Sequence, residues 1–100
     1  MENFELKFNV TNQDVLDADC ALASIISQVL EKYIQMKDTA YPTIDKNDIP
    51  YYVSQLEPLD QWMWVLDRMK ESFERHDHST VNEYRYGRIL FAKYFDSLWI

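Results

Sequence analysis

The first segment with a regular hydrophobic pattern lies at the start of the chain. Four apolar residues alternate there with polar ones, namely Phe4, Leu6, Phe8 and Val10. Because a period of two is typical of a strand with one buried face, we predict a β-strand within residues 1–10. No later segment alternates as clearly. The strand is therefore expected to pair with a second copy of the chain or with a foreign strand, or else to lie as an extended arm over the helices.

Three later segments repeat apolar residues at steps of three and four, which is the pattern of amphipathic α-helices. It predicts helices over residues 12–37, 58–75 and 80–99. All three prolines fall within residues 38–58, the last of them at the start of the second helix, so we expect a loop there with a short helical turn, capped by Asp48. The fold class is mainly α: a single domain over residues 1–100 with three long helices, a helical turn in a proline-bearing loop and an N-terminal strand.

The helix predicted over residues 12–37 is apolar on two sides. The main row consists of Val15, Ala18, Leu22, Ile25, Val29, Tyr33 and Met36. The second row consists of Leu16, Cys20, Ala23, Ile26, Leu30 and Ile34. Two apolar rows need more cover than the other two helices supply, and the strand lacks a partner within the chain. We therefore expect a homo-oligomer.

The other two long helices each carry a clear core stripe. The stripe of the second consists of Leu59, Trp62, Leu66, Met69 and Phe73. The third has a main row of Val81, Tyr84, Phe91, Phe95 and Leu98, flanked by Gly87, Leu90, Tyr94 and Trp99. A glycine inside a helix costs about 1 kcal/mol relative to alanine, so Gly87 predicts a close approach to its backbone, by another helix or by a ligand ring.

Composition limits the class of protein. The chain is 47% hydrophobic with one Gly and one Cys, so it is expected to fold without a disulfide framework. It shows neither a long uncharged apolar run nor a signal-peptide start, and we expect a reducing cytoplasm and no membrane span. Its net charge of −7 argues against binding to duplex DNA or to an anionic membrane, since both require a basic face.

Residues that carry catalysis or bind metals are sparse. A single glycine cannot form a phosphate-cradling loop, and no serine follows the strand-to-helix pattern of a nucleophile elbow. Cys20 falls in an apolar row and is interpreted as a core residue. His76 and His78 are two residues apart, without the spacing that directs two imidazoles at one ion from a helix. We expect no enzyme, no catalytic residue, no metal and no cofactor.

The candidate ligand site rests on the distribution of charge. Residues 1–67 hold twelve acidic and four basic residues, whereas residues 68–100 hold five acidic and six basic ones. Guanidinium groups and aromatic rings can hold a nucleotide by stacking and by bonds to phosphate. The candidate ligand-binding residues are Arg85, Arg88, Lys93, Tyr86, Tyr51 and Tyr52. The alternative is that these cations form a basic face that is exposed to solvent and binds no ligand.

Residues 20–99 resemble a group of small proteins of tailed phages. The first block is Leu22, Ile25, Ile26 and Leu30, followed in the loop by Pro42, Asp45, Asp48 and Pro50. The second block reads WMWVLDRMKESFE from Trp62, and the third reads GRILFAKYFDSLW from Gly87. The chain departs from the group at Cys20, where the group tends to have Trp, and at Ala92, where it has Gly.

The resemblance implies a phage origin and a setting in the host cytoplasm. A compact phage protein without catalytic residues acts most often by binding. We therefore expect an antagonist of host defence that sequesters a nucleotide-derived signal or blocks a defence protein. A protein docking on the acidic half of the chain is the competing mode of binding. The alternative function is a structural or assembly component of the virion.

Overall fold

The protein is mainly helical. The computed structural model describes residues 12, 16–36, 40–76 and 81–99, with the side chains of residues 81–83 left aside. The α-helices are α2 (Ala18–Met36), α3 (Tyr51–Ser54), α4 (Pro58–Glu74) and α5 (Val81–Tyr94). Two 3₁₀ turns, η1 (Lys46–Asp48) and η2 (Phe95–Ser97), precede α3 and follow α5. The three predicted long helices and the helical turn in the proline-bearing loop are thus confirmed.

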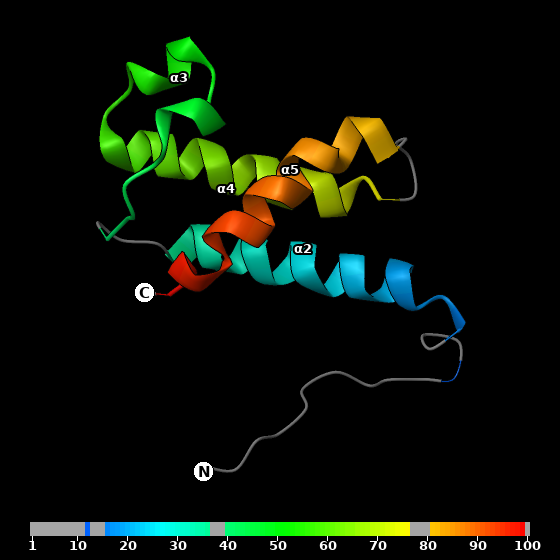
Figure 1. Ribbon diagram of the computed structural model, residues 1–100. Helices are drawn as coiled ribbons and strands as arrows, with labels where there is room; N and C mark the ends of the chain where they lie inside the picture. Colours follow the sequence, from blue (N-terminus) through cyan, green and yellow to red (C-terminus); the bar gives the residue numbers. More distant parts are fainter. Residues whose placement is uncertain (1–11, 13–15, 37–39, 77–80, 100) are drawn as a thin grey trace.

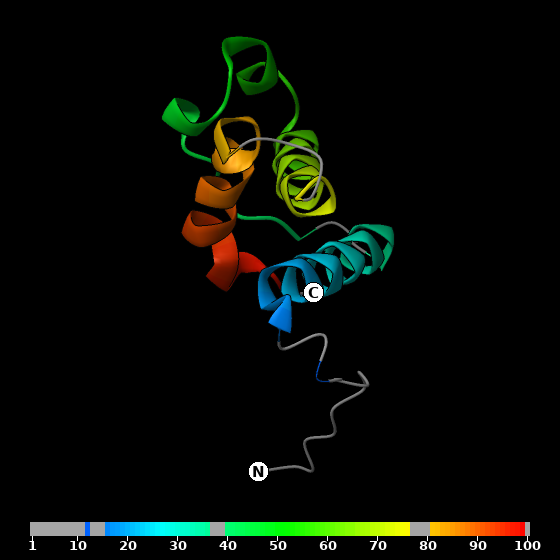
Figure 2. The same cartoon turned by 90° about the vertical axis from the view of Figure 1, so that its right-hand side faces the viewer.

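The central helix is α4, which packs against both α2 and α5. In Figure 1, α2 and α4 run in opposite directions, and α5 crosses α4 obliquely. Figure 2 shows α4 and α5 next to each other, with α2 below them and α3 at the far end of the molecule from α2. The segment between α2 and α4, which includes α3, therefore lies beside α4 and α5.

The core gathers around the predicted stripe of α4. Trp62, Leu66 and Met69 are fully buried, as is Val65 on the same helix. The other elements each contribute large buried side chains to the same cluster, namely Leu30 of α2, Val53 of α3 and Leu90 of α5. The prediction that the second long helix buries this stripe is confirmed for four of its residues, whereas Leu59 is half-buried.

The structure shows which side of α2 faces the core. Ala23, Ser27 and Leu30 are buried, whereas Leu22 and Val29 of the main row are 57% and 53% exposed. The small side chains of Ala23 and Ser27 let the α2 backbone come close to α4, which the larger residues of the main row would prevent. The main row is therefore mostly exposed, a choice that the two-row pattern had left open.

Helix α5 buries residues of the flanking row and is shorter than the predicted helix. Leu90 and Tyr94 of the flanking row are buried, whereas Phe95 of the predicted main row is 57% exposed. The α-helix also ends at Tyr94, short of the predicted end at residue 99. The chain then turns toward α2, where the Tyr33 hydroxyl donates to the Trp99 carbonyl oxygen at 2.8 Å. That hydrogen bond holds the end of the chain away from the axis of α5.

The loop turns are capped differently from the prediction. The Asp45 carboxylate accepts a hydrogen bond from the backbone N–H of Asn47 and so caps η1. Pro50 precedes α3 without a side-chain cap. Asp48 was expected to cap this turn, but its carboxylate is engaged by α5 instead, so that prediction was wrong.

Two expectations concern parts of the chain outside this description. The strand predicted within residues 1–10 lies outside the described residues and stays a prediction. Residue 12 is helical, and residues 13–15 lie outside the described part of the helix predicted over 12–37. Among the described residues, every helix is too short or too polar to cross a membrane.

Candidate functional site

The proline-bearing loop is fastened to α5 by polar side chains of that helix. Lys93 Nζ lies 2.6 Å from Asp48 Oδ2 and 3.4 Å from Asp45 Oδ2. The Tyr94 hydroxyl donates to Asp48 Oδ2 at 2.7 Å and accepts from the Asp45 backbone N–H at 3.0 Å. The Tyr86 hydroxyl donates to the Asp48 carbonyl oxygen. Lys93, a predicted ligand residue, thus forms ion pairs with two carboxylates of the loop.

The ionisation of these groups follows from the same contacts. Burial raises the pKa of the Asp48 carboxyl, but the bonds from Lys93 and Tyr94 outweigh it and hold the pKa below the ordinary value of 3.8. The bond to Asp48 is the main cause that raises the pKa of Lys93. Burial is the main cause that raises the pKa of the Tyr94 hydroxyl. The carboxylate and the ammonium are therefore both charged at neutral pH.

Arg88, a second predicted ligand residue, fills the space between α4 and α5. Its guanidinium carbon lies 4.2 Å from the centre of the Phe73 ring and 4.3 Å from that of the Tyr84 ring. Nη2 donates to the Ser72 carbonyl oxygen at 3.2 Å and lies 2.8 Å from Nδ1 of His76. These contacts hold the side chain within the protein.

His76 links Arg88 to the start of α2. Its Nε2 lies 2.8 Å from Asp19 Oδ2, and ligand atoms of Asp19, Cys20 and His76 all lie within 4.8 Å of one another. Such a trio is a candidate for a transition metal. However, Nδ1 accepts from Arg88, which can only donate, so in the neutral ring Nε2 carries the hydrogen and donates to Asp19. We interpret the trio as a polar network between helices.

The remaining predicted ligand residues lie on the surface. Arg85 is exposed on α5, and at about 100° per residue it points away from Gly87, which faces α4. Tyr51 and Tyr52 of α3 are 80% and 66% exposed. Tyr86 is 41% exposed, with its ring centre 6.1 Å from that of Trp64. The six predicted residues are therefore spread over separate surroundings.

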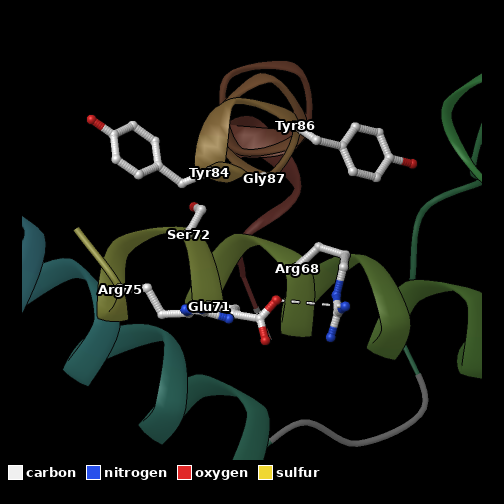
Figure 3. A pocket seen from close by; sticks show the side chains of 7 residues that line it. All are labelled: Arg68, Glu71, Ser72, Arg75, Tyr84, Tyr86 and Gly87. Carbon is white, nitrogen blue, oxygen red and sulfur yellow. Dashed lines mark ion pairs between the residues drawn. The ribbon is translucent and has the colours of Figure 1, made fainter. Parts of the chain in front are cut away.

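The structure instead places a pocket between α4 and α5. It has a volume of about 140 Å³, and its lining residues are Arg68, Glu71, Ser72, Arg75, Tyr84, Tyr86 and Gly87. In Figure 3, Glu71 lies between the two arginines of α4, and the rings of Tyr84 and Tyr86 point to opposite sides of α5. Of the predicted ligand residues, Tyr86 lines this pocket.

The close approach of the two helices defines the floor of the pocket. A Cβ atom added to Gly87 would lie 2.3 Å from the Arg68 carbonyl oxygen and 2.6 Å from Ser72 Cβ. The predicted approach at Gly87 is thus made by another helix. Because α5 has no side chain at this point, the longer side chains on either side rise around a hollow.

The two arginines of the pocket differ in their partners. Arg68 pairs with Glu71 at 3.6 Å, and its guanidinium carbon lies 5.3 Å from the centre of the Trp64 ring. Its Nε is buried and has no hydrogen-bond partner among the described residues. Arg75 is exposed and forms no ion pair within the described part of the chain. The pocket therefore holds one guanidinium that is partly neutralised by Glu71 and one that has no ion pair among the described residues.

Sequence reasoning missed Arg68 and Arg75. A signal was present, because the two residues are seven positions apart and so share one face of α4. Their relation to α5 depends on where the helices cross, which the sequence pattern does not give. The pocket is thus a feature of packing more than of local sequence.

Comparisons of the chain with protein-family models, with curated proteins and with solved structures found no match.

Proposed function

We propose that the chain is a phage accessory protein that acts by binding, as an antagonist of host defence that sequesters a nucleotide-derived signal. The observation that carries the proposal is the pocket between α4 and α5, where Arg68 and Arg75 lie beside Tyr84 and Tyr86. Guanidinium groups bind phosphate through pairs of parallel hydrogen bonds, and tyrosine rings offer faces for a base. The proposed site thus combines both parts of nucleotide recognition.

The size of the pocket limits what it holds. Sites that enclose a whole drug-sized ligand have volumes of about 300–1,000 Å³. At about 140 Å³, this pocket has room for a phosphoryl group only. In the proposal, the phosphoryl group lies between the arginines and the rest of the nucleotide lies outside, over the neighbouring surface.

The surface beside Tyr86 suits the aromatic part of such a ligand. The Tyr86 hydroxyl donates to the Asp48 carbonyl oxygen, and α3, which carries exposed Tyr52, begins three residues after Asp48. Base stacking on an aromatic ring is worth about 1–3 kcal/mol. Tyr52 is therefore proposed as the ring that receives the base, with Tyr51 next to it on α3.

Glu71 works against an anionic ligand. Its carboxylate lies between the two arginines and pairs with Arg68 at 3.6 Å. A phosphoryl group that enters the pocket must compete with this carboxylate for Arg68. Glu71→Gln removes the negative charge, and we expect it to raise the affinity for a phosphorylated ligand.

The test is titration calorimetry of the full chain against inorganic phosphate, cyclic nucleotides and ADP-ribose-type nucleotides. We expect one nucleotide class to bind more tightly than millimolar. Arg75→Ala should weaken this binding about tenfold or more, and Glu71→Gln should strengthen it. The matched control is Arg85→Ala, which removes an exposed arginine outside the pocket and should leave the affinity unchanged. Binding no tighter than millimolar across the panel, or a loss with Arg85→Ala but not with Arg75→Ala, would overturn the proposal.

The second candidate function is a protein–protein contact. It is favoured by the exposure of Tyr51 and Tyr52 on α3, with Leu56 42% exposed just after them. Tyrosine is enriched among the residues that dominate binding energy at interfaces. The partner would be a host defence protein or, if the chain is part of the virion, a neighbouring virion protein. Mass spectrometry of purified particles distinguishes the two, because a virion component occurs at a fixed copy number.

A further inference from the structure

The outer side of α2 carries apolar residues that no described part of the chain covers. Leu22, Val29 and Met36 recur every seven residues and are 57%, 53% and 58% exposed. Ala18, which is exposed, and Ile25, which is half-buried, complete the row at steps of three and four. We call these five residues the outer stripe.

The outward direction of the stripe is fixed by contacts on the opposite side of α2. Lys70 Nζ of α4 lies 2.6 Å from Glu31 Oε1, and His76 lies 2.8 Å from Asp19. Leu30 is buried between these two contacts. Turning the stripe inward would break both ion pairs and expose Leu30, so the stripe is a stable part of the surface.

The spacing of the stripe matches a second helix. Apolar residues at alternating steps of three and four form the seam along which two helices pack side by side. Lys32 stands in the same row, between Val29 and Met36, and is exposed. A cation in this row makes a parallel pairing unfavourable, because the two copies of Lys32 would lie beside each other.

An antiparallel pairing of two copies of α2 resolves this conflict. The helix is preceded by Asp17, whereas Lys32 lies toward its other end. Reversing the second copy moves its Lys32 away from Lys32 of the first copy and toward the end that Asp17 precedes, and it opposes the two helix dipoles. The same surface thus supplies both halves of a two-fold symmetric contact.

We propose that the outer stripe binds a second copy of this chain, with the two α2 helices antiparallel. Ile25 then lies opposite Val29 of the second copy, and Met36 lies opposite Ala18. Trp99 is 62% exposed and adjoins the same helix, because its carbonyl oxygen accepts from Tyr33. It extends the apolar surface beyond the stripe. This contact does not depend on the pocket between α4 and α5.

The area of the stripe indicates a moderate affinity. Five partly exposed residues offer on the order of half of the ~800 Å² that each partner buries in a standard interface. We therefore expect a dissociation constant in the micromolar range and a mass that depends on concentration.

Analytical ultracentrifugation of the full chain from about 1 to about 500 µM tests the proposal. The mass should rise from the 12.1 kDa of one chain toward twice that value. Val29→Lys should remain a monomer, because it places a charge in the centre of the seam. Ser24→Lys is the matched control, since it adds the same charge at exposed Ser24, which lies further around the helix from the stripe, and it should associate like the wild type. Circular dichroism checks that both variants keep their helix content.

Each contrary outcome is decisive. A wild-type monomer at every concentration overturns the proposal and leaves the stripe to another segment of this chain or to a different protein. A Val29→Lys variant that associates like the wild type overturns it as well, because the contact must then lie elsewhere.

The direction of pairing is tested by a distance between spin labels. In a Cys20→Ala background, Gln35→Cys carries one label on each copy. Antiparallel helices in the proposed register separate the labelled positions by on the order of 25 Å along the axis, whereas parallel helices bring them to on the order of 10 Å. A short distance would overturn the antiparallel arrangement.

Discussion

The backbones of α4 and α5 approach each other closely at one residue of α5. Gly87 is where the α5 backbone meets α4, and a Cβ atom there would lie 2.3 Å from the Arg68 carbonyl oxygen. That oxygen is backbone and cannot move away as the end of a side chain can. Gly87→Ala would gain about 1 kcal/mol in helix propensity, but it would force the two helices apart.

We expect Gly87→Ala to lower the free energy of unfolding by about 1–3 kcal/mol, the range for overfilled packing. Urea denaturation followed by circular dichroism measures the change. The control is Arg85→Ala, which places an alanine at an exposed site of the same helix and should stay within about 0.5 kcal/mol of the wild type. A Gly87→Ala variant more stable than the wild type would mean that the helices are not packed this closely.

At the scale of the element, the apolar periodicity predicted where the helices lie better than it predicted which side of each helix is buried. The steps of three and four located the three long helices, because this pattern follows directly from helix geometry. For α2 the pattern left two rows, and the buried row is the one that contains Ala23 and Ser27. Interhelical distance and ion pairs with α4 decide between such rows, and neither can be deduced from the apolar pattern of α2 alone.

Two leucines of α2 test this facing with the same substitution. Leu30 is 2% exposed and Leu22 is 57% exposed. Leu30→Ala should lower the free energy of unfolding by about 2–5 kcal/mol, because it leaves a cavity beside α4. Leu22→Ala should change it by less than about 0.5 kcal/mol in samples dilute enough to be monomeric. Chemical denaturation of both variants checks the pair, and equal losses would contradict the observed orientation of α2.

At the scale of the molecule, the candidate site shows where sequence reasoning stops. The charge asymmetry directed attention to the C-terminal third, in which both arginines of the pocket lie. It did not show that Arg88 is held between Phe73 and Tyr84, or that Lys93 is paired with Asp48. These partners come from α4 and from the loop, so they depend on tertiary packing that a single helical pattern does not contain.

Three ion pairs that link different elements make the free energy of unfolding depend on pH in the acid range. Asp48 joins the loop to α5, Glu31 joins α2 to α4, and Asp19 joins α2 to the end of α4. Hydrogen bonds from Lys70 and from His76 are the main causes that lower the pKa of Glu31 and of Asp19. For Asp48, burial acts in the opposite direction, but the bonds from Lys93 and Tyr94 prevail and lower its pKa as well.

A carboxyl whose pKa is lower in the folded state than in the unfolded chain stabilises the protein above the unfolded value. This stabilisation is lost as the pH falls through the folded value. The ordinary pKa is 3.8 for Asp48 and 4.5 for Glu31, so we expect the free energy of unfolding to fall below about pH 4.5. Urea denaturation at a series of pH values measures this slope. Asp48→Asn should be less stable than the wild type at pH 7 and should lose less on acidification, since asparagine does not titrate. An acid slope as steep as that of the wild type would show that the ion pair between the loop and α5 does not contribute to it.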